Sequence, residues 1–245
     1  MTRVKICGLR DAATAMAAAE AGADFIGLMF ADSRRRVTPQ ECHDIVSAIH
    51  EHRKYNEPVT VPGPARGEVS NRSWYGAWNE ALEEVLFHRR PLLVGVFADQ
   101  VATDVVDIAE AAGLDLVQLS GGENDDYVRQ MQRPVLRVVH VGAGTTVDEI
   151  QAKAPPGIGQ AVMLDTASTG LRGGTGERFD WEIAAEAGRL APLMLAGGLD
   201  SESVGGAIEV AAPWAVDVSS GVETDGEKDI EKIVAFLRAA KGARV

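Results

Sequence analysis

The chain has 245 residues and a formal net charge of −12, and 46% of its residues are hydrophobic. So acidic a surface argues against nucleic acid or an anionic membrane as partner, and no apolar run reaches the roughly 18 residues that a membrane-spanning helix needs. The two cysteines, Cys7 and Cys42, are too few for a disulfide framework. With no secretory signal expected at the N-terminus either, we expect a cytoplasmic protein.

Short apolar runs alternate with helix-like stretches along the whole chain. The runs are typical of parallel strands buried on both faces: Val4–Cys7, Asp24–Phe30, Leu92–Phe97, Leu114–Leu119, Val135–Val139, Ala161–Leu164, Leu193–Ala196 and Trp214–Val218. The helix-like stretches are Asp11–Ala21, Pro39–His50, Thr103–Ala112, Asp125–Met131, Val147–Ala152, Trp181–Ala187, Glu202–Val210 and Glu227–Ala240. Eight β-α units in order predict one (β/α)₈ barrel domain, a TIM barrel, over residues 1–245.

One joint between a helix and the next strand occurs twice. In both copies a glycine, Gly22 or Gly113, ends a helix, and an aspartate, Asp24 or Asp115, leads into an apolar strand. Because glycine readily takes the left-handed conformation that closes a helix, the pattern predicts a repeated turn between helix and strand. Chance similarity in an alanine-rich chain is the alternative.

The connection between the second helix and the third strand is much longer than the usual ~2–6 residues. We interpret residues 51–90 as an insertion, whose second half has apolar residues at a spacing that predicts a helix packed on one face: Trp74, Trp78, Leu82, Val85 and Leu86. Its position before a strand places it at the end of the barrel opposite the catalytic end. It serves either as a stabilising flap or as a surface for a partner or a second copy.

Two groups able to carry protons follow apolar strands at the catalytic end of the predicted barrel. Cys7 ends the first strand and Asp165 follows the sixth. A thiolate and a carboxylic acid at one barrel mouth can act as general base and general acid. Taken alone, Cys7 is more readily interpreted as a small buried hydrophobic residue.

Glycine and serine follow the last two strands. Gly197 and Gly198 come after the seventh strand, and Ser219, Ser220 and Gly221 come after the eighth. Phosphate sites of this fold are often built from these two loops, with backbone N–H groups directed at the anion, so we expect a phosphate site here, with plain tight turns as the alternative. The glycine-rich loop 169–176 after the sixth strand is typical of a mobile lid.

These motifs together resemble the phosphoribosylanthranilate isomerase family. The resemblance starts at Val4-Lys5-Ile6-Cys7-Gly8-Leu9 and continues in the same order through most of the chain outside the insertion: 22–27, 33–37, 94–97, 114–119, 164–166, 173–176, 179–181, 195–199 and 216–223.

The resemblance implies an Amadori rearrangement of N-(5-phosphoribosyl)anthranilate in tryptophan biosynthesis. It implies that Asp165 protonates the ribose ring oxygen, that Cys7 removes the C2′ proton, and that Arg35 holds the anthranilate carboxylate. The phosphate would be bound at Gly197, Gly198, Ser219, Ser220 and Gly221. No metal or cofactor is implied, and the expected partner is a small phosphorylated substrate bound by a monomer or homodimer.

The chain departs from the family pattern after the fourth strand, where Gln118-Leu119-Ser120-Gly121 replaces the usual Gln-Leu-His-Gly. His140, near the end of the fifth strand, is a candidate to replace the missing histidine. The alternatives are a related histidine-pathway sugar-phosphate isomerase, a barrel isomerase with two substrates, and a phosphate-binding paralogue without catalysis. Cys7 argues against the first, because that class has an aspartate at the end of the first strand.

Overall fold

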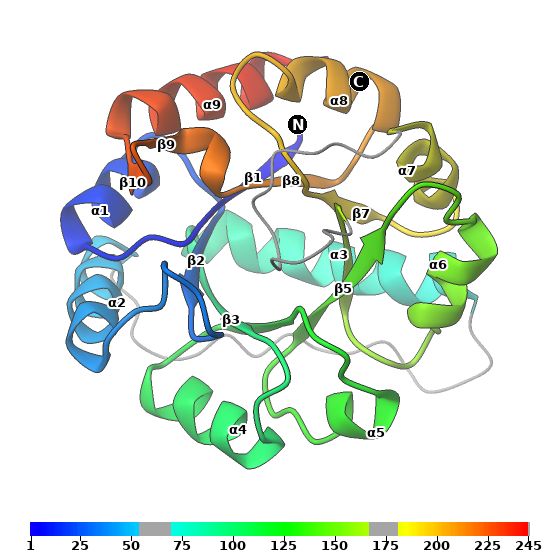
Figure 1. The fold of residues 1–245 in the computed structure, drawn as a ribbon, viewed down its shortest axis with the longest axis horizontal. Coiled ribbons are helices and arrows are strands. Elements are labelled where there is room, and N and C mark those ends of the chain that lie inside the picture. Colours follow the sequence, from blue (N-terminus) through cyan, green and yellow to red (C-terminus); the bar gives the residue numbers. More distant parts are fainter. Residues whose placement is uncertain (54–69, 167–180, 245) are drawn as a thin grey trace.

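The structure is a computed structural model that describes residues 1–53, 70–166 and 181–244. Eight parallel strands form a closed barrel in chain order, and β1 pairs with β8 to complete it (Figure 1). The strands are β1 (Arg3–Cys7), β2 (Phe25–Met29), β3 (Leu92–Phe97), β4 (Leu116–Leu119), β5 (Val135–Val141), β6 (Ala161–Thr166), β7 (Leu193–Leu195) and β8 (Ala215–Val218). The predicted (β/α)₈ barrel is confirmed.

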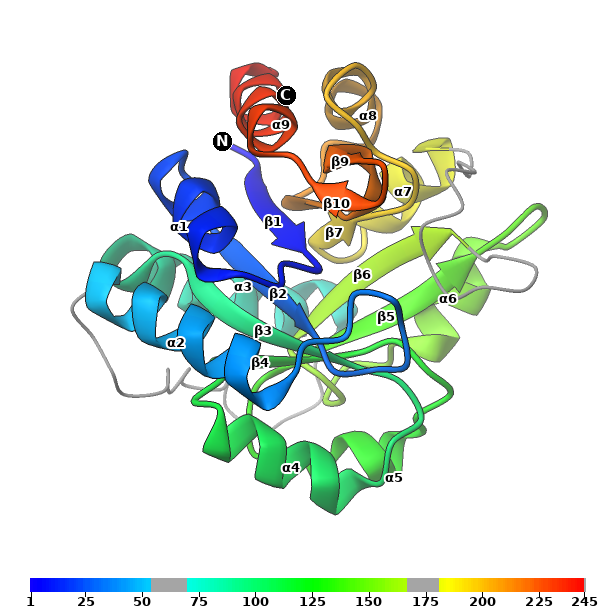
Figure 2. The ribbon, with the colours of Figure 1, turned by 60° about the vertical axis from the view of Figure 1, so that its left-hand side comes forward.

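Helices surround the barrel (Figures 1 and 2). They are α1 (Ala12–Glu20), α2 (Pro39–Arg53), α3 (Asn71–Arg89), α4 (Ala102–Ala111), α5 (Asp125–Val128), α6 (Val147–Lys153), α7 (Trp181–Gly188), α8 (Val204–Ala211) and α9 (Ile230–Gly242). No helix in the described ranges is long and apolar enough to cross a membrane.

The last helix begins three residues later than predicted, at Ile230 instead of Glu227. The intervening chain forms a two-stranded hairpin of β9 (Glu223–Thr224) and β10 (Glu227–Lys228). Its turn is Asp225-Gly226, and both residues have positive φ, of 53° and 88°. An Asp-Gly pair is a common hairpin turn because both of its residues tolerate this conformation, so this signal was present in the sequence and was missed.

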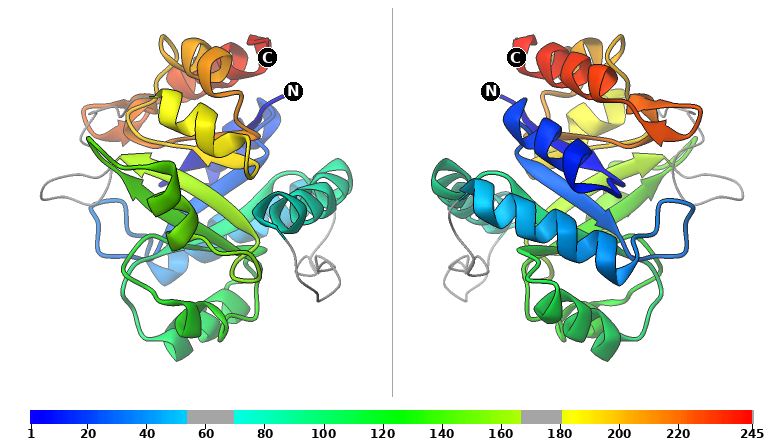
Figure 3. Two further views of the ribbon diagram at one scale, coloured as in Figure 1. Left: turned by 90° about the vertical axis from the view of Figure 1, so that its right-hand side faces the viewer. Right: turned by 90° about the vertical axis from the view of Figure 1, so that its left-hand side faces the viewer.

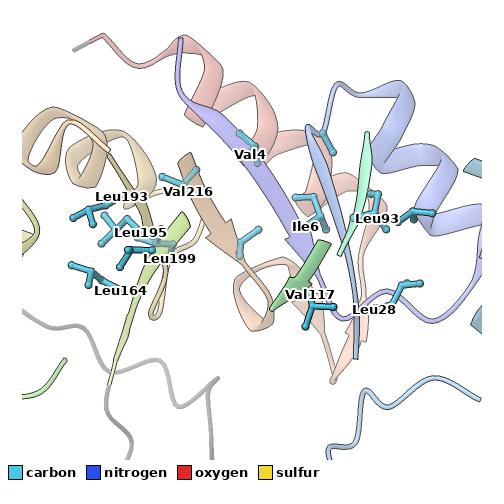
Figure 4. Close-up of a cluster of buried hydrophobic side chains, with 14 of the residues drawn as sticks. Val4, Ile6, Leu28, Leu93, Val117, Leu164, Leu193, Leu195, Leu199 and Val216 are labelled. Atoms are coloured by element: carbon cyan, nitrogen blue, oxygen red, sulfur yellow. The ribbon is translucent and has the colours of Figure 1, made fainter. Parts of the chain in front are cut away.

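The main hydrophobic core lies between the outer face of the barrel and the helices. Side chains such as Val4, Ile6, Leu93 and Val216 have no exposed surface and point outward from alternate strand positions (Figure 4). Because side chains alternate across a strand, the residues between them, such as Lys5, face the barrel interior. This alternation determines which side chains face the barrel interior and can reach the mouth at the carboxyl ends of the strands.

The joint between helix and strand forms as predicted in both places. Gly22 and Gly113 have φ values of 97° and 63°, in the left-handed region. One carboxylate oxygen of Asp24 accepts the backbone N–H of Val4 at 2.8 Å, and Asp115 accepts that of Leu93 at 2.7 Å. Asp24, just before β2, is therefore hydrogen-bonded to the start of β1, and Asp115, just before β4, is hydrogen-bonded to the start of β3.

Helix α3, the second half of the insertion, covers the end of the barrel opposite the β9–β10 hairpin (Figure 3). Trp78, Leu82 and Leu86 belong to the same buried cluster as the interior side chains Phe25 and Met163. In the second half of the helix, Glu83 accepts hydrogen bonds from the Arg3 guanidinium and, at 2.6 Å, from the Trp214 indole. Near the start of the helix, Trp74 donates to the Gly159 carbonyl at 2.8 Å. The predicted helix and its position at the bottom are confirmed, and α3 closes the barrel there.

Candidate active site

Cys7 and Lys5 lie on the same face of β1, two residues apart, and both point into the barrel. The Cys7 side chain is 4% exposed and Lys5 is completely buried. Gly27 on the neighbouring strand makes room for both, because a Cβ there would lie 2.9 Å from Cys7 Sγ and 3.0 Å from Lys5 Nζ. The thiol and the ammonium group therefore share one small space beneath the mouth of the barrel.

Asp217 on β8 pairs with Lys5 across the closure of the barrel. Its Oδ1 lies 2.8 Å from Lys5 Nζ, and it is 8% exposed. Asp165 is partly exposed and is the second-last residue of β6. It is in register with His140 on β5. The strand is two residues longer than predicted, so Asp165 lies within it instead of after it. The closed barrel thus brings the two predicted proton carriers to one mouth, with a charged pair between them.

The surroundings change the proton affinities of these groups in different ways. Burial raises the pKa of Cys7, Lys5 opposes this effect, and the net pKa lies above the ordinary range. Burial and then the nearby Asp217 carboxylate raise the pKa of Asp165 to about 6. Burial acts to lower the pKa of Lys5, but Asp217 and Cys7 outweigh it and the pKa is raised, so the ammonium stays charged. Asp165 therefore keeps its proton much closer to neutral pH than an exposed aspartate does.

Arg35 lies at the rim of the mouth and is held by Glu223. Arg35 Nε and Nη2 donate to the two carboxylate oxygens at 2.6 and 3.0 Å. Arg34 donates to the same carboxylate at 2.6 Å, and Lys228 does so at 2.8 Å. These side chains, together with Gly8, line one hollow at the surface. The same hollow is also lined by Arg10, Asp11, Asp225 and Glu227, so its formal positive and negative charges balance.

The β9–β10 hairpin turns Lys228 inward toward this cluster. Besides binding Glu223, Lys228 Nζ donates to the Ser219 carbonyl at 2.8 Å. Burial lowers the pKa of Lys228, although Glu223 opposes the change. Neither Glu223 nor Lys228 was singled out from the sequence, because the role of both depends on a hairpin that was taken for the start of a helix.

The loops after β7 and β8 meet in direct backbone contact. Gly197 and Gly198 have φ values of 92° and 65°. A Cβ on Gly197 would overlap the Thr166 hydroxyl, and one on Gly221 would overlap the Leu199 carbonyl oxygen. Ser220 begins a short 3-10 helix (Ser220–Val222), as expected for the segment after β8, and the Ser219 hydroxyl donates to the Cys7 carbonyl at 3.2 Å. Glycine at 221 therefore allows the loops after β7 and β8 to approach each other, and glycine at 197 allows the loop after β7 to approach the end of β6.

The remaining predicted features lie around the same mouth or outside the described residues. His140 is within β5, and its Nε2 lies 3.0 Å from the carbonyl oxygen of Ser120, the residue that departs from the family pattern. Gln118 donates to the Ser120 hydroxyl at 3.1 Å. The predicted lid, 169–176, falls on residues that the structure does not describe.

Lys5 and Asp217 are the residues that sequence reasoning missed at the centre of the site. Lys5 could have been found, because alternation along a strand puts residue i−2 on the same side as Cys7. Asp217 could not have been paired with it from spacing alone, since 212 residues separate the two.

Comparison with known proteins identifies the family of this chain. The family model described as N-(5'phosphoribosyl)anthranilate (PRA) isomerase matches residues 52–239. An N-(5'-phosphoribosyl)anthranilate isomerase of Dehalococcoides mccartyi is 39% identical over 99% of this chain and 97% of that protein. One of Desulforamulus reducens is 36% identical over 98% of this chain and 96% of that protein.

Comparison with solved structures leads to the same family. A dimeric phosphoribosylanthranilate isomerase from Thermotoga maritima, in a form described as mutually generated monomers, superposes with a TM-score of 0.72 at 28% identity, covering 99% of this chain and 100% of that one. Another, in complex with reduced 1-(o-carboxyphenylamino)-1-deoxyribulose 5-phosphate, has a TM-score of 0.67 at 28% identity and the same coverage of both chains. This chain belongs to the phosphoribosylanthranilate isomerase family.

Proposed function

We propose that Asp165 and Cys7 carry the two proton transfers of the reaction for which the family is named. As a phosphoribosylanthranilate isomerase of tryptophan biosynthesis, the chain converts N-(5'-phosphoribosyl)anthranilate to 1-(2-carboxyphenylamino)-1-deoxyribulose 5-phosphate. The observation that carries the assignment is the position of the two groups at one barrel mouth, with an acid whose pKa is raised to about 6.

The proposed reaction needs one acid and one base. Asp165 gives its proton to the ribose ring oxygen as the bond from that oxygen to C1′ breaks, and the lone pair of the anthranilate nitrogen forms a C=N bond to C1′. The Cys7 thiolate then removes the proton on C2′, and the C–H electrons form a C1′=C2′ bond while the nitrogen regains its lone pair. The enolamine becomes the ketone by losing its C2′ hydroxyl proton and gaining one at C1′.

The substrate is anionic at both ends, and two groups of residues suit these ends. We assign the phosphate to the loops after β7 and β8, with Gly197, Gly198, Ser219, Ser220 and Gly221, because their close contact brings backbone N–H groups together. We assign the anthranilate carboxylate to Arg35, whose planar guanidinium matches a carboxylate with two hydrogen bonds. The reacting carbons would then lie between them, above Cys7 and Asp165.

The test is turnover of freshly formed phosphoribosylanthranilate by the purified protein, followed by the loss of its fluorescence. Cys7→Ala and Asp165→Asn should each lower kcat by about 10²–10⁴-fold with little change in KM, because each removes a proton carrier and not a binding group. Cys42→Ala is the matched control, because Cys42 is buried in α2 and takes no part in the site. Full kcat in Cys7→Ala would rule out the thiol as the base.

A further inference from the structure

The charged pair Lys5–Asp217 lies in the barrel interior and has no part in the reaction as written above. Lys5 has no exposed surface, and its Nζ is 2.8 Å from Asp217 Oδ1. Taking two charges out of water costs so much that a buried pair often stabilises a protein no better than well-packed apolar side chains. Stability is therefore a weak reason for this pair, and its position suggests a role in the chemistry.

Each member of the pair acts on both Cys7 and Asp165, but most strongly on a different one of them. Lys5 Nζ and Cys7 Sγ both lie within 3.0 Å of the position that a Cβ on Gly27 would take, so the ammonium is beside the thiol. Among the charged groups around Cys7, Lys5 has the largest effect, whereas among those around Asp165 the largest is that of Asp217. The cation thus favours ionisation of the base, and the anion opposes ionisation of the acid.

We propose that the Lys5–Asp217 pair enlarges the fraction of enzyme in which Cys7 is a thiolate while Asp165 keeps its proton, and that both members are positioning residues for the isomerisation. This inference rests on the proposed function, since it concerns the same acid and base. The Lys5 ammonium stabilises the thiolate, and the Asp217 carboxylate favours the protonated form of Asp165, so each shifts its partner toward the reactive state. In each turnover Asp165 gives up one proton and Cys7 receives one, so the total charge of the four groups is the same before and after the chemical steps.

The other charged groups near the acid and base come from different elements. Lys228 on β10 acts on Cys7 from a distance, but it is held by Glu223 and the Ser219 carbonyl. His140 on β5 faces Asp165, and the backbone N–H of Thr166 donates to the Asp165 carboxylate at 2.8 Å. Gly27 on β2 and Gly197 after β7 bring no side-chain charge to the site. Lys5 and Asp217 are therefore the groups whose replacement should move both titrations.

The proposal can be tested without turnover, in a Cys42→Ala background where Cys7 is the sole thiol. The pH dependence of alkylation by iodoacetamide reports the fraction of Cys7 present as thiolate. We expect Lys5→Met to move this titration upward by about one pH unit or more, which is about tenfold less thiolate at a given pH. Asp217→Asn should move it downward, and Lys5→Arg, which keeps the charge, should restore most of the wild-type profile.

A single replacement leaves one buried charge without its partner, so the double variant Lys5→Met/Asp217→Asn is also needed. It should raise the pKa of Cys7 and lower that of Asp165, and ¹³C NMR of the carboxyl group measures the latter directly. The kcat should fall at least about tenfold, with KM nearly unchanged. Circular dichroism and thermal melting show whether each variant is folded. A folded double variant with wild-type titrations would overturn the proposal, whereas a wrong choice of base would instead appear as full activity in Cys7→Ala.

Discussion

Arg35 and Glu223 meet through two parallel hydrogen bonds at the barrel mouth, from Nε at 2.6 Å and from Nη2 at 3.0 Å. A guanidinium has five N–H donors in one plane, so this contact takes one edge and leaves the edge around Nη1. Within the described residues, no hydrogen bond donated by Nη1 is found. Glu223 thus fixes the plane of Arg35 and leaves one edge of the guanidinium, to which we assign the substrate carboxylate.

Arg35→Lys should therefore weaken substrate binding. A lysine keeps the positive charge but cannot form two parallel hydrogen bonds with a carboxylate, so we expect KM to rise about 10–100-fold, which corresponds to roughly 1.5–3 kcal/mol, with a smaller effect on kcat. Arg34→Lys is the matched control, because its exposed side chain also contacts Glu223. Steady-state kinetics measure both, and equal effects of the two substitutions would contradict a special role for Arg35.

The pH dependence of kcat/KM should be bell-shaped. Below the pKa of Asp165, which is about 6, both groups are protonated and the site lacks a base. Above the raised pKa of Cys7 both are ionised and the site lacks an acid. Between these two pKa values the form with a protonated Asp165 and an ionised Cys7 is a small fraction that does not change with pH. Activity should therefore rise as pH increases through about 6, level off, and fall as pH passes the Cys7 value.

The substrate phosphate also titrates near pH 6. The lower limb is therefore assigned by a ¹³C NMR titration of the Asp165 carboxyl group in the free enzyme. A midpoint near that of an ordinary exposed aspartate would show that burial and Asp217 do not raise this pKa as described.

Gly221→Ala should disturb the proposed phosphate site. The added methyl group would overlap the Leu199 carbonyl oxygen, so the loops after β7 and β8 would have to separate. We expect about a tenfold or greater rise in KM and in the inhibition constant for inorganic phosphate, since several N–H contacts would be lost together. Gly205→Ala is the control, because a Cβ there meets no atom within 4 Å and the residue lies in α8. That substitution should leave KM unchanged and stabilise the helix slightly.

Leu82→Ala should destabilise the protein without changing its chemistry. Leu82 is completely buried where α3 closes the bottom of the barrel. Removing its side chain leaves a cavity, and the free energy of unfolding should fall by about 2–5 kcal/mol, measured by denaturant titration. Phe87→Ala on the same helix is the control, because that side chain is 81% exposed and should change stability by less than about 0.5 kcal/mol. A large loss of kcat in folded Leu82→Ala would show that the bottom of the barrel is coupled to the mouth.

The sequence by itself determined the order and type of the elements. Strands buried on both faces are short uninterrupted apolar runs, so all eight could be recognised, and β3 was predicted with its observed bounds, Leu92–Phe97. Position at a strand end made Cys7 and Asp165 candidates, because the catalytic end of this fold is known once the strands are, and the family resemblance then favoured them over a purely structural role. The glycines at 22 and 113 likewise predicted their turns from local conformation alone.

Only the tertiary structure decided which distant groups meet. Closure of the barrel between β1 and β8 places Asp217 against Lys5, and it is packing around this pair that gives the acid and the base their different proton affinities. The Asp225-Gly226 turn likewise sends Lys228 back to Glu223 and Ser219. Burial and charge act through space, so their effect on Cys7 depends on neighbours that spacing along the chain does not reveal.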